Sequence, residues 1–526
     1  MSPRRPPSNP ADPFAEGQAL AQAGRHAEAI ERFGQALAER PDDRNTLYAL
    51  GRTAEAIGDR AAAATFYRRV LDQAPDQVEA LVALANLLRA QGQPGDAIAL
   101  LQPALGRAPA EADLWNTLGS AVREAGDAAN AEVFYREALR LEPRSASVIG
   151  NLAELLADAG DLTGALELYD RAVRLDPRTS QTRVNRGLVR LQAGRLAEGW
   201  RDYEQRLRVP GREIHADHGL PRWMGEDRPG LKLLVTAEQG VGDQIMFASL
   251  VPELAARLAG AGGGLVLEAE PRLAPLFARS FPQAVVHRWD MKSVGGQTRA
   301  AYGWLGEAGG AAAAIPLGSL PGLLRPSAGA FPADAAAYLA ADPAETGRWT
   351  AWLQASGPGP YIGLSWRSGL GGGLRNREYA PLEAWAAFVS DLPGVPVMLQ
   401  YGATTGEIEA LAQASGRNIL VPPDLDQRAE LDRTAALASA LDAVVTAPTA
   451  TAWLSAAAGT PTLKLLHKDT WTAFGADHEP FAPACRPVRA PAGGDWAGAF
   501  GLARIQLSRL LGGAGLGAGA AADPSP

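Results

Sequence analysis

The sequence predicts two architectures in succession, an all-α array of helical hairpins and then an α/β region with parallel sheets. The array is indicated by a proline that recurs every 34 residues, at Pro41, Pro75, Pro109, Pro143 and Pro177. The α/β region is indicated by a change of hydrophobic spacing after residue 230, from helical spacing to short apolar runs that alternate with amphipathic helices. Because 526 residues are too many for one core, we expect about three modules.

Other positions of the array keep the same register. Glycine occupies the inter-helix turn, alanine follows it, and an aromatic ring fills a third position, as at Gly58, Ala63 and Tyr67 or Gly126, Ala131 and Tyr135. This period is that of tetratricopeptide (TPR) repeats, in which helix pairs stack because one pair cannot bury its own apolar face. We predict a TPR solenoid over 11–207, with about six hairpins, and a connector over 208–230.

The concave side of a TPR solenoid is a usual binding surface for an extended polypeptide. Asn116, Asn151 and Asn185 fall in the first helices of their hairpins, and an asparagine amide both donates and accepts hydrogen bonds. They are therefore candidate contacts to the backbone of an acceptor peptide. The alternative is that they are ordinary polar residues of a helix surface.

Two α/β segments are predicted, at 231–340 and 341–510. In the first, strands are expected at 231–237, 264–270 and 284–289, and helices at 244–258 and 271–280, whereas 291–337 gives no assignment. In the second, strands are expected at 361–366, 396–401, 418–421, 443–446 and 462–466, and helices at 381–390, 406–414, 433–440 and 449–458. Ligands of open α/β sheets bind beyond the carboxyl ends of the strands, so those loops should carry the chemistry.

Composition argues against several classes of function. A formal net charge of −8 disfavours a nucleic-acid binder, since proteins that follow phosphates need a basic face. The single cysteine, Cys485, has no internal disulfide partner, and the longest apolar stretch, 311–324, is interrupted by Pro316 and Pro321. We expect a cytoplasmic protein with no membrane span, and disordered tails at 1–10 and 511–526.

Three segments resemble a known family. They are the run from Trp200 through Pro221-Arg222-Trp223 to LLVTAEQGVGDQIMFASLVPELA, the segment IGLSWRSG at 362–369, and DAVVTAPTATAWLSAAAGTPTLKLL at 442–466. They are similar to bacterial TPR proteins with a glycosyltransferase domain related to the heptosyltransferases of lipopolysaccharide synthesis, over residues 15 to about 490. The resemblance implies a GT-B fold of two Rossmann-like lobes, a nucleotide-sugar donor held mainly by the second lobe, and no metal or cofactor. It also implies likeness to flagellin-modifying enzymes and protein O-glycosyltransferases.

The turn after the first α/β strand carries the candidate catalytic residue. Gly240 and Gly242 permit a tight strand-to-helix turn, and the free N–H groups of the next helix face an anion or hydroxyl. In the family, the aspartate of the corresponding Gly-Asp pair is taken as the general base that deprotonates the acceptor hydroxyl, and Asp243 matches it. The alternatives are that Asp243 only caps the helix, or that Glu238 is the base.

Three arginines of the second α/β segment are donor-binding candidates. Arg367 follows a predicted strand, and Arg375 and Arg377 lie just beyond a glycine-rich loop. Guanidinium groups on such a loop are suited to a diphosphate, because they form bidentate charge-assisted bonds as the leaving nucleotide gains charge. The alternative is a solvated surface loop.

A predicted helix start offers further donor contacts. Thr449 and Thr451 lie where free amide donors favour phosphate. The family commonly has Asp-Thr-Ser and then a histidine here, whereas this chain has Pro448-Thr449-Ala450 and then Trp453. Lys464, on the next strand, is expected to have a phosphate or carboxylate partner, or else to lie on an edge strand.

These observations predict a glycosyltransferase that moves a sugar from a nucleotide-sugar to a hydroxyl of an acceptor protein. Flagellin is the first candidate acceptor, and the TPR groove would select it. A glycan acceptor is a variant of this prediction. The competing hypothesis is a non-catalytic TPR adaptor whose degenerate α/β region only scaffolds or senses nucleotide.

Overall fold

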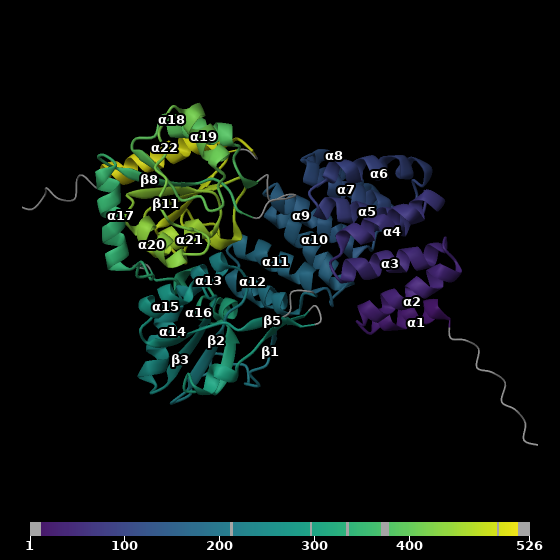
Figure 1. Cartoon of the computed structure of the whole chain (residues 1–526), viewed down its shortest axis with the longest axis horizontal. Helices are drawn as coiled ribbons and strands as arrows, with labels where there is room; N and C mark the ends of the chain where they lie inside the picture. Colours follow the sequence, from purple (N-terminus) through teal and green to yellow (C-terminus); the bar gives the residue numbers. More distant parts are fainter. Residues whose placement is uncertain are drawn as a thin grey trace, which may run out of the picture. The chain divides into compact units, whose positions relative to one another are not determined.

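A computed structural model describes residues 12–210, 214–294, 297–332, 336–369, 378–491 and 494–513. The chain divides into two compact units (Figure 1). The first takes in the repeat helices as far as Leu155, with Arg174–Asp176, and the second takes in the rest of the described chain. The tail predicted at 1–10 lies outside the described residues. The tail predicted at 511–526 overlaps them only to residue 513, where a helix ends.

The repeat region consists of successive helical hairpins. Its elements are α1 (Pro13–Gln22), α2 (His26–Glu39), α3 (Arg44–Ala56), α4 (Arg60–Gln73), α5 (Val78–Ala90), α6 (Pro94–Arg107), α7 (Ala112–Ala125), α8 (Ala128–Leu141), α9 (Ala146–Asp158), α10 (Leu162–Leu175), α11 (Ser180–Gln192), α12 (Leu196–Tyr203) and the 3-10 turn η1 (Glu204–Arg208). The predicted hairpins are therefore present. The last of these helices, α12, ends at Tyr203, and the chain continues as the 3-10 turn η1.

The repeated small and aromatic positions pack against each other. Tyr135 is buried, and a Cβ at Gly119 would lie 2.9 Å from its ring. Only glycine leaves room for the ring there, since real Cβ atoms essentially never come closer than 3.0 Å. Gly126, at the inter-helix turn, has φ of 110°, which glycine adopts without steric cost.

The first α/β sheet has four parallel strands in the order β4-β3-β2-β7. They are β2 (Lys232–Thr236), β3 (Gly264–Ala269), β4 (Ala284–Arg288) and β7 (Ala313–Pro316), with helices α13 (Val241–Ala248), α14 (Val251–Gly260), α15 (Ala274–Ser280) and α16 (Leu320–Leu324). The helix predicted at 244–258 is thus two helices. The break precedes Pro252, which lacks the N–H that a continuous helix would need.

A second, three-stranded sheet has the order β1-β6-β5, from β1 (Ile214–Ala216), β5 (Met291–Val294) and β6 (Gln297–Ala300). None of these strands is predicted from the sequence. β1 falls in the segment predicted as a connector, so that segment is partly regular structure.

The third sheet has five parallel strands in the order β12-β11-β10-β8-β9. They are β8 (Tyr361–Ser365), β9 (Val395–Met398), β10 (Ala443–Thr446), β11 (Thr462–Leu466) and β12 (Cys485–Arg489). The accompanying helices are α17 (Pro343–Ala355), α18 (Leu382–Ser390), α19 (Thr405–Ser415), α20 (Leu431–Ser439), α21 (Ala450–Ala457) and α22 (Trp496–Gly513). The strand predicted at 418–421 is reduced to an isolated bridge between Leu420 and Val397.

Strand order reverses once in each parallel sheet. β2 lies between β3 and β7, and β8 lies between β9 and β10. Such reversals open a crevice beyond the carboxyl ends of the strands, where α/β proteins bind ligands. The segments after β2 and β8 are therefore where a site is expected.

An aromatic cluster joins the last repeat hairpin to the α/β region. The ring of Trp200 on α12 contacts Phe247 of α13 and, farther along the chain, Phe474 and Phe481, with centroids 5.7 to 6.5 Å apart. Its Nε1 also donates to the Arg325 carbonyl (3.0 Å). The sixth hairpin thus shares the core of the second unit. The predicted boundary at 207/208 is not a boundary between compact units.

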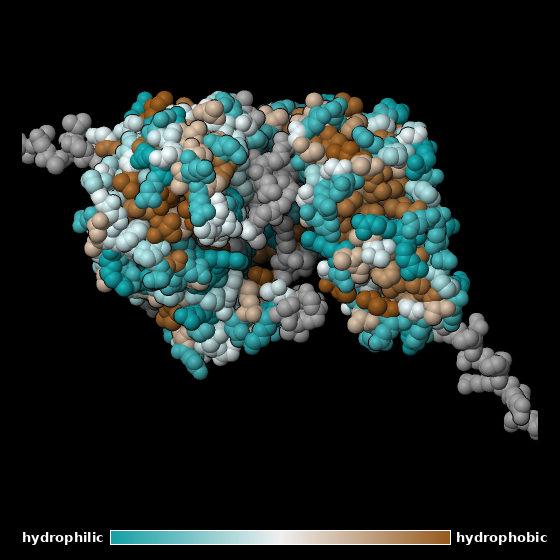
Figure 2. All heavy atoms as spheres, turned by 45° about the horizontal axis from the view of Figure 1, so that its top comes forward, coloured by the Kyte–Doolittle hydropathy of each residue, from teal (hydrophilic) through white to brown (hydrophobic). Residues whose placement is uncertain are grey.

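The surface mixes hydrophobic and hydrophilic side chains. On the face in Figure 2, brown hydrophobic residues lie among teal hydrophilic ones over the repeat helices. Large hydrophobic side chains of the repeat helices that are more than half exposed include Ile57 and Val133. None of the described helices is both long and apolar enough to cross a bilayer.

Candidate functional site

The turn after β2 brings Asp243 to a cavity. Helix α13 has Gly240 as its N-cap, and Asp243 is its third residue. The Gly240 N–H donates to Asp243 Oδ2 over 3.4 Å, so the alternative role of a helix cap is present as a long contact. The same side chain lines a cavity of about 750 Å³, which we call the large cavity. Capping and facing a cavity are therefore compatible.

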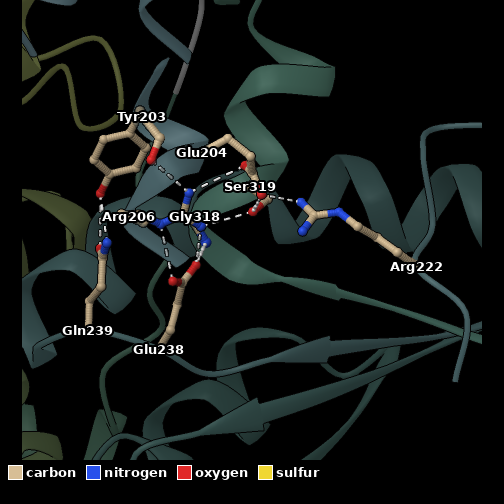
Figure 3. A network of polar contacts seen from close by, with 8 residues as sticks. All are labelled: Tyr203, Glu204, Arg206, Arg222, Glu238, Gln239, Gly318 and Ser319. Atoms are coloured by element: carbon tan, nitrogen blue, oxygen red, sulfur yellow. Dashed lines mark hydrogen bonds and ion pairs between the residues drawn. The ribbon is translucent and has the colours of Figure 1, made fainter. Parts of the chain in front are cut away.

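Glu238, the alternative base, is held by a buried arginine (Figure 3). Arg206 of η1 donates from Nε to Oε2 (3.1 Å) and from Nη2 to Oε1 (2.5 Å), and both side chains are only 8% exposed. The Gly318 N–H also donates to Oε1 (2.9 Å). Because its charge is matched and its oxygens are occupied, Glu238 fixes the turn and is poorly suited to accept a proton.

Gly318 allows this network to close. A Cβ there would lie 2.8 Å from Glu238 Oε1 and 3.1 Å from Arg206 Nη2. The next residue, Ser319, accepts a hydrogen bond from Arg206 Nη2 (2.8 Å). Three segments, η1, the turn after β2 and the turn after β7, are thus joined by one polar network (Figure 3).

The tight bend of the turn falls on Gln239, not on the glycines predicted for it. Gln239 has φ of 63°, whereas Gly240 has φ of −80°. A left-handed non-glycine residue costs about 1–2 kcal/mol. The Gln239 amide donates to the Tyr203 hydroxyl (2.8 Å), which holds this conformation. Gly242 serves another purpose, since a Cβ there would touch Trp453 of α21 at 3.4 Å.

Burial raises the pKa of Asp243 to about 6. The Gly240 N–H and Arg206 lower this pKa, whereas the nearby Glu238 carboxylate raises it. A general base works best when its pKa lies near the working pH. At neutral pH, Asp243 is therefore mostly ionised and still more basic than an ordinary aspartate.

A second cavity, of about 250 Å³, is lined by residues of both α/β segments; we call it the small cavity. Its lining includes Gly242 and Arg272 from the first α/β segment and Tyr401, Arg428 and Thr451 from the second. Among the described residues that line it, the charged side chains are both cationic. Helices α13 and α21 both begin beside it, because Gly242 and Ala450 each line it. The amide donors and the Arg428 guanidinium favour an anionic ligand there, and Arg272 adds a guanidinium that is paired through its Nε with Glu270 (2.6 Å).

Two buried polar atoms near the small cavity have no partner within the described part of the chain. Thr449, the N-cap of α21, is 7% exposed and its Oγ1 makes no hydrogen bond. Gln427, which lines the cavity, is 6% exposed; its Nε2 donates to the Met398 carbonyl (2.8 Å), but its Oε1 has no donor. An unmatched buried polar group costs about 1–3 kcal/mol, so such groups commonly mark a binding site. Thr451, the second threonine predicted there, lines the same cavity.

Arg367 lines neither cavity. It donates from Nε to Glu407 Oε1 (2.7 Å) and from Nη2 to the Gly402 carbonyl (3.0 Å). The hydrogen bond from Arg367 lowers the pKa of Glu407 to about 2. The donor role of Arg367 stays a prediction, and Arg375 and Arg377 lie outside the described residues.

Lys464 is buried inside the third sheet, so the alternative of an edge-strand lysine is wrong. The unpredicted strand β12 covers that side of β11. The ammonium contacts the buried Glu479 and lies 4.9 Å from the ring centroid of Trp453. Its expected anionic partner is therefore a protein carboxylate, and this arrangement does not leave its charge for a donor phosphate.

The three candidate asparagines divide into a pair and a single residue. Asn151 Nδ2 donates to Asn116 Oδ1 (2.8 Å), whereas Asn185 accepts from Gln181 Nε2 (2.7 Å). All three are half-buried. Their contact with an acceptor peptide stays a prediction.

Sequence reasoning missed Arg206, Arg272 and Arg428. Arg272 follows the carboxyl end of β3, where the general rule for α/β sheets could have found it. Its Nε donates to Glu270 Oε1 (2.6 Å) and its Nη1 to the Arg428 carbonyl (2.9 Å), a contact between the two α/β segments. Arg206 has a weaker signal, namely that a buried Glu238 requires a cation.

Comparison with known proteins identifies the repeats. Residues 14–78, 56–121 and 122–187 match models of the tetratricopeptide repeat, which confirms the prediction from the 34-residue period. The chain is also similar to Protein FlbA of Caulobacter vibrioides, with 37% identity over 290 residues that cover 55% of this chain and 48% of that protein. The match thus spans about half the length of this curated relative.

Solved structures are similar to part of this chain. A thermophilic TPR protein of Thermus thermophilus matches with 27% identity and a TM-score of 0.31, over 34% of this chain and 97% of that chain. MamA of Desulfovibrio magneticus matches with 21% identity and a TM-score of 0.28, over 31% of this chain and 93% of that chain.

Proposed function

We propose that this chain is a GT-B glycosyltransferase that transfers a sugar from a nucleotide-sugar donor to a hydroxyl group of an acceptor protein. The TPR repeats are protein-binding elements and would select that acceptor. Flagellin is the first acceptor to test, from the family resemblance of the sequence. The reaction needs a donor site that favours phosphate, an acceptor site, and a base between them.

One observation carries this proposal: consecutive residues of one turn line different cavities. Gly242 lines the small cavity and Asp243 lines the large one. The small cavity has cationic side chains and two helix starts, which suit the phosphate of a donor. The large cavity has a carboxylate whose pKa is raised to about 6, which suits a base beside an acceptor hydroxyl. A donor and an acceptor would therefore meet at this turn.

The transfer step follows from that placement. Asp243 accepts the proton of the acceptor hydroxyl as the hydroxyl oxygen forms a bond to the anomeric carbon of the sugar. The bond from that carbon to the phosphate oxygen breaks, and the nucleotide leaves with the electron pair. Arg272, Arg428 and the amides at the start of α21 stabilise the growing negative charge on the nucleotide.

The test is nucleotide release from a panel of nucleotide-sugars, with flagellin purified from cells that lack this chain as the acceptor. We expect release from one donor, and a matching mass increase on the acceptor. Asp243→Asn should lower transfer about 100- to 10,000-fold while nucleotide binding persists. The matched control is Asp477→Asn, because Asp477 is almost fully exposed and its partner His478 is also exposed. Unchanged transfer by Asp243→Asn would contradict the role of that residue.

A non-catalytic TPR adaptor is the second candidate. It is favoured by the engagement of two predicted donor ligands, since Arg367 is paired with Glu407 and Lys464 with Glu479. An adaptor would bind its client equally well after Asp243→Asn and would release no nucleotide from any donor. The same panel therefore separates the two functions.

A further inference from the structure

We infer that the sixth repeat hairpin forms one wall of the acceptor site and selects acceptors with an apolar side chain beside the modified hydroxyl. This inference rests on the proposed function. It assigns Val184 and Leu188 of α11 a role in specificity that differs from general client binding by the repeats.

The position of these residues is the first support. Val184 and Leu188 line the large cavity, the same cavity that Asp243 lines. Ile214 of β1 and Leu220 add apolar surface to its lining. An apolar side chain next to the reactive hydroxyl would gain by leaving water here, at about 25 cal/mol for each Å² buried.

The repeat register gives independent support. The positions that precede Leu188 by successive multiples of 34 residues are all polar, namely Glu154, Ser120, Asn86 and Arg52. Leu188 is half-buried: it packs against the core of the second unit and also lines the large cavity, so its apolar side chain serves both surfaces. Among the described residues that line the large cavity, those of the repeat region all belong to this hairpin.

The charges around the large cavity disfavour charged neighbours of the acceptor hydroxyl. Arg206 is matched by Glu238, and Arg222 forms an ion pair with Glu204. An acidic neighbour would meet repulsion from Asp243. A basic neighbour would pair with Asp243 and lower its pKa, which weakens it as a base.

The wall is fixed relative to Asp243. Arg186 of α11 donates from Nε to Asp202 Oδ2 (2.7 Å), and Arg190 Nη1 donates to the same oxygen (2.7 Å). Asp202 is buried on α12, the helix that Trp200 anchors in the core of the α/β region. Because α11 is joined to α12 and α12 to the core, Leu188 keeps its place in the cavity.

The test uses the full chain with synthetic peptides that differ only beside a single serine, where they carry leucine, alanine, aspartate or lysine. With the active donor, we expect the wild type to use the leucine peptide about tenfold better, in kcat/KM, than the aspartate peptide. Leu188→Gln should reduce that preference severalfold. Leu188→Lys should shift it toward the aspartate peptide, a gain that misfolding does not produce.

Controls separate this inference from the proposed function. Ile57→Gln alters an exposed apolar residue of an earlier hairpin and should leave the ranking of peptides unchanged. Val184→Ala is a milder second variant, and release of nucleotide without any peptide reports an intact donor site. If sugar is transferred but all peptides react equally, or the Leu188 variants keep the wild-type ranking, the inference is wrong and the glycosyltransferase stands. If no donor yields transfer or nucleotide release, both fail.

Discussion

Each α/β segment has a glutamate in a bidentate pair with an arginine, and the two pairs differ in burial. Arg206 and Glu238 are each 8% exposed, whereas Arg367 and Glu407 are 30% and 26% exposed. A buried pair is costly to break because the remaining charge stays without water or a partner. A pair near the surface contributes little and can open. The first pair therefore holds the turn of Asp243 in place, while the second can release its arginine.

The largest effect is expected when the buried pair is broken. Arg206→Met should destabilise the protein by about 3–5 kcal/mol, because Glu238 is left charged and buried. Denaturant unfolding of the purified protein measures this. Arg222→Met is the matched control, since Arg222 pairs with Glu204 at 39% exposure and should cost about 1 kcal/mol or less. Equal losses for the two variants would remove the distinction between buried and exposed pairs.

The pH dependence of sugar transfer tests the ionisation of Asp243, whose turn is held by the buried pair of Arg206 and Glu238. Asp243 must be ionised to act as a base, so kcat/KM should fall about tenfold per pH unit below its pKa of about 6. The stability of the folded protein changes with pH in the opposite sense to kcat/KM. Because the folded-state pKa is raised from 3.8 to about 6, ionisation of Asp243 lowers stability as pH rises through that window. Asp243→Asn should therefore gain stability relative to the wild type as pH rises from 4 to 6, and a constant difference would contradict the raised pKa.

A substitution beside the small cavity is expected to have a smaller effect than the two changes above. Thr449→Val removes a buried hydroxyl that has no partner within the described residues, so stability should hold or rise by about 1 kcal/mol. Donor affinity should fall about fivefold if that hydroxyl binds the donor. Thr460→Val is the contrasting variant, since the Thr460 hydroxyl donates to the Ala438 carbonyl (2.8 Å) and its loss should destabilise. Calorimetry with the active nucleotide-sugar and thermal unfolding distinguish these outcomes.

The smallest effect on stability is expected at the exposed pair. Arg367→Met should cost about 1 kcal/mol or less in the free energy of unfolding. Its effect on the donor decides its role: a tenfold loss of nucleotide-sugar affinity would mean that Arg367 leaves Glu407 to bind the donor. Unchanged affinity would show that the sequence-based assignment of Arg367 is wrong.

The parts of the fold with a strong local pattern were predictable. The 34-residue period predicted the hairpins, and the apolar runs at 443–446 and 462–466 coincide with β10 and β11. Strand β12 was missed because Pro487 and two arginines interrupt its pattern, features that an edge strand tolerates. β5, β6 and β7 were missed in the stretch rich in glycine and alanine, where strand pairing rather than local preference decides the structure.

A site residue could be predicted from the sequence only where its place directly after a strand determines where it lies. Asp243 and Thr451 line cavities as their places after strands suggested. The ion pairs of Arg206, Arg367 and Lys464 join residues 15 to 40 positions apart in the sequence, and no local pattern specifies such partners. Tertiary contacts therefore decide which cations are available to a ligand.

The Trp200 cluster has a practical consequence for redesign. A cut at residue 207 would strip an indole from between Phe247, Phe474 and Phe481, and it would remove Tyr203 and Arg206, which hold Gln239 and Glu238 of the turn after β2. A chain truncated in this way would be inactive because its core is damaged, whatever protein the repeats bind. To redirect the protein to another acceptor, the hairpins that end before Leu155 should be exchanged, and the rest of the chain should be kept intact.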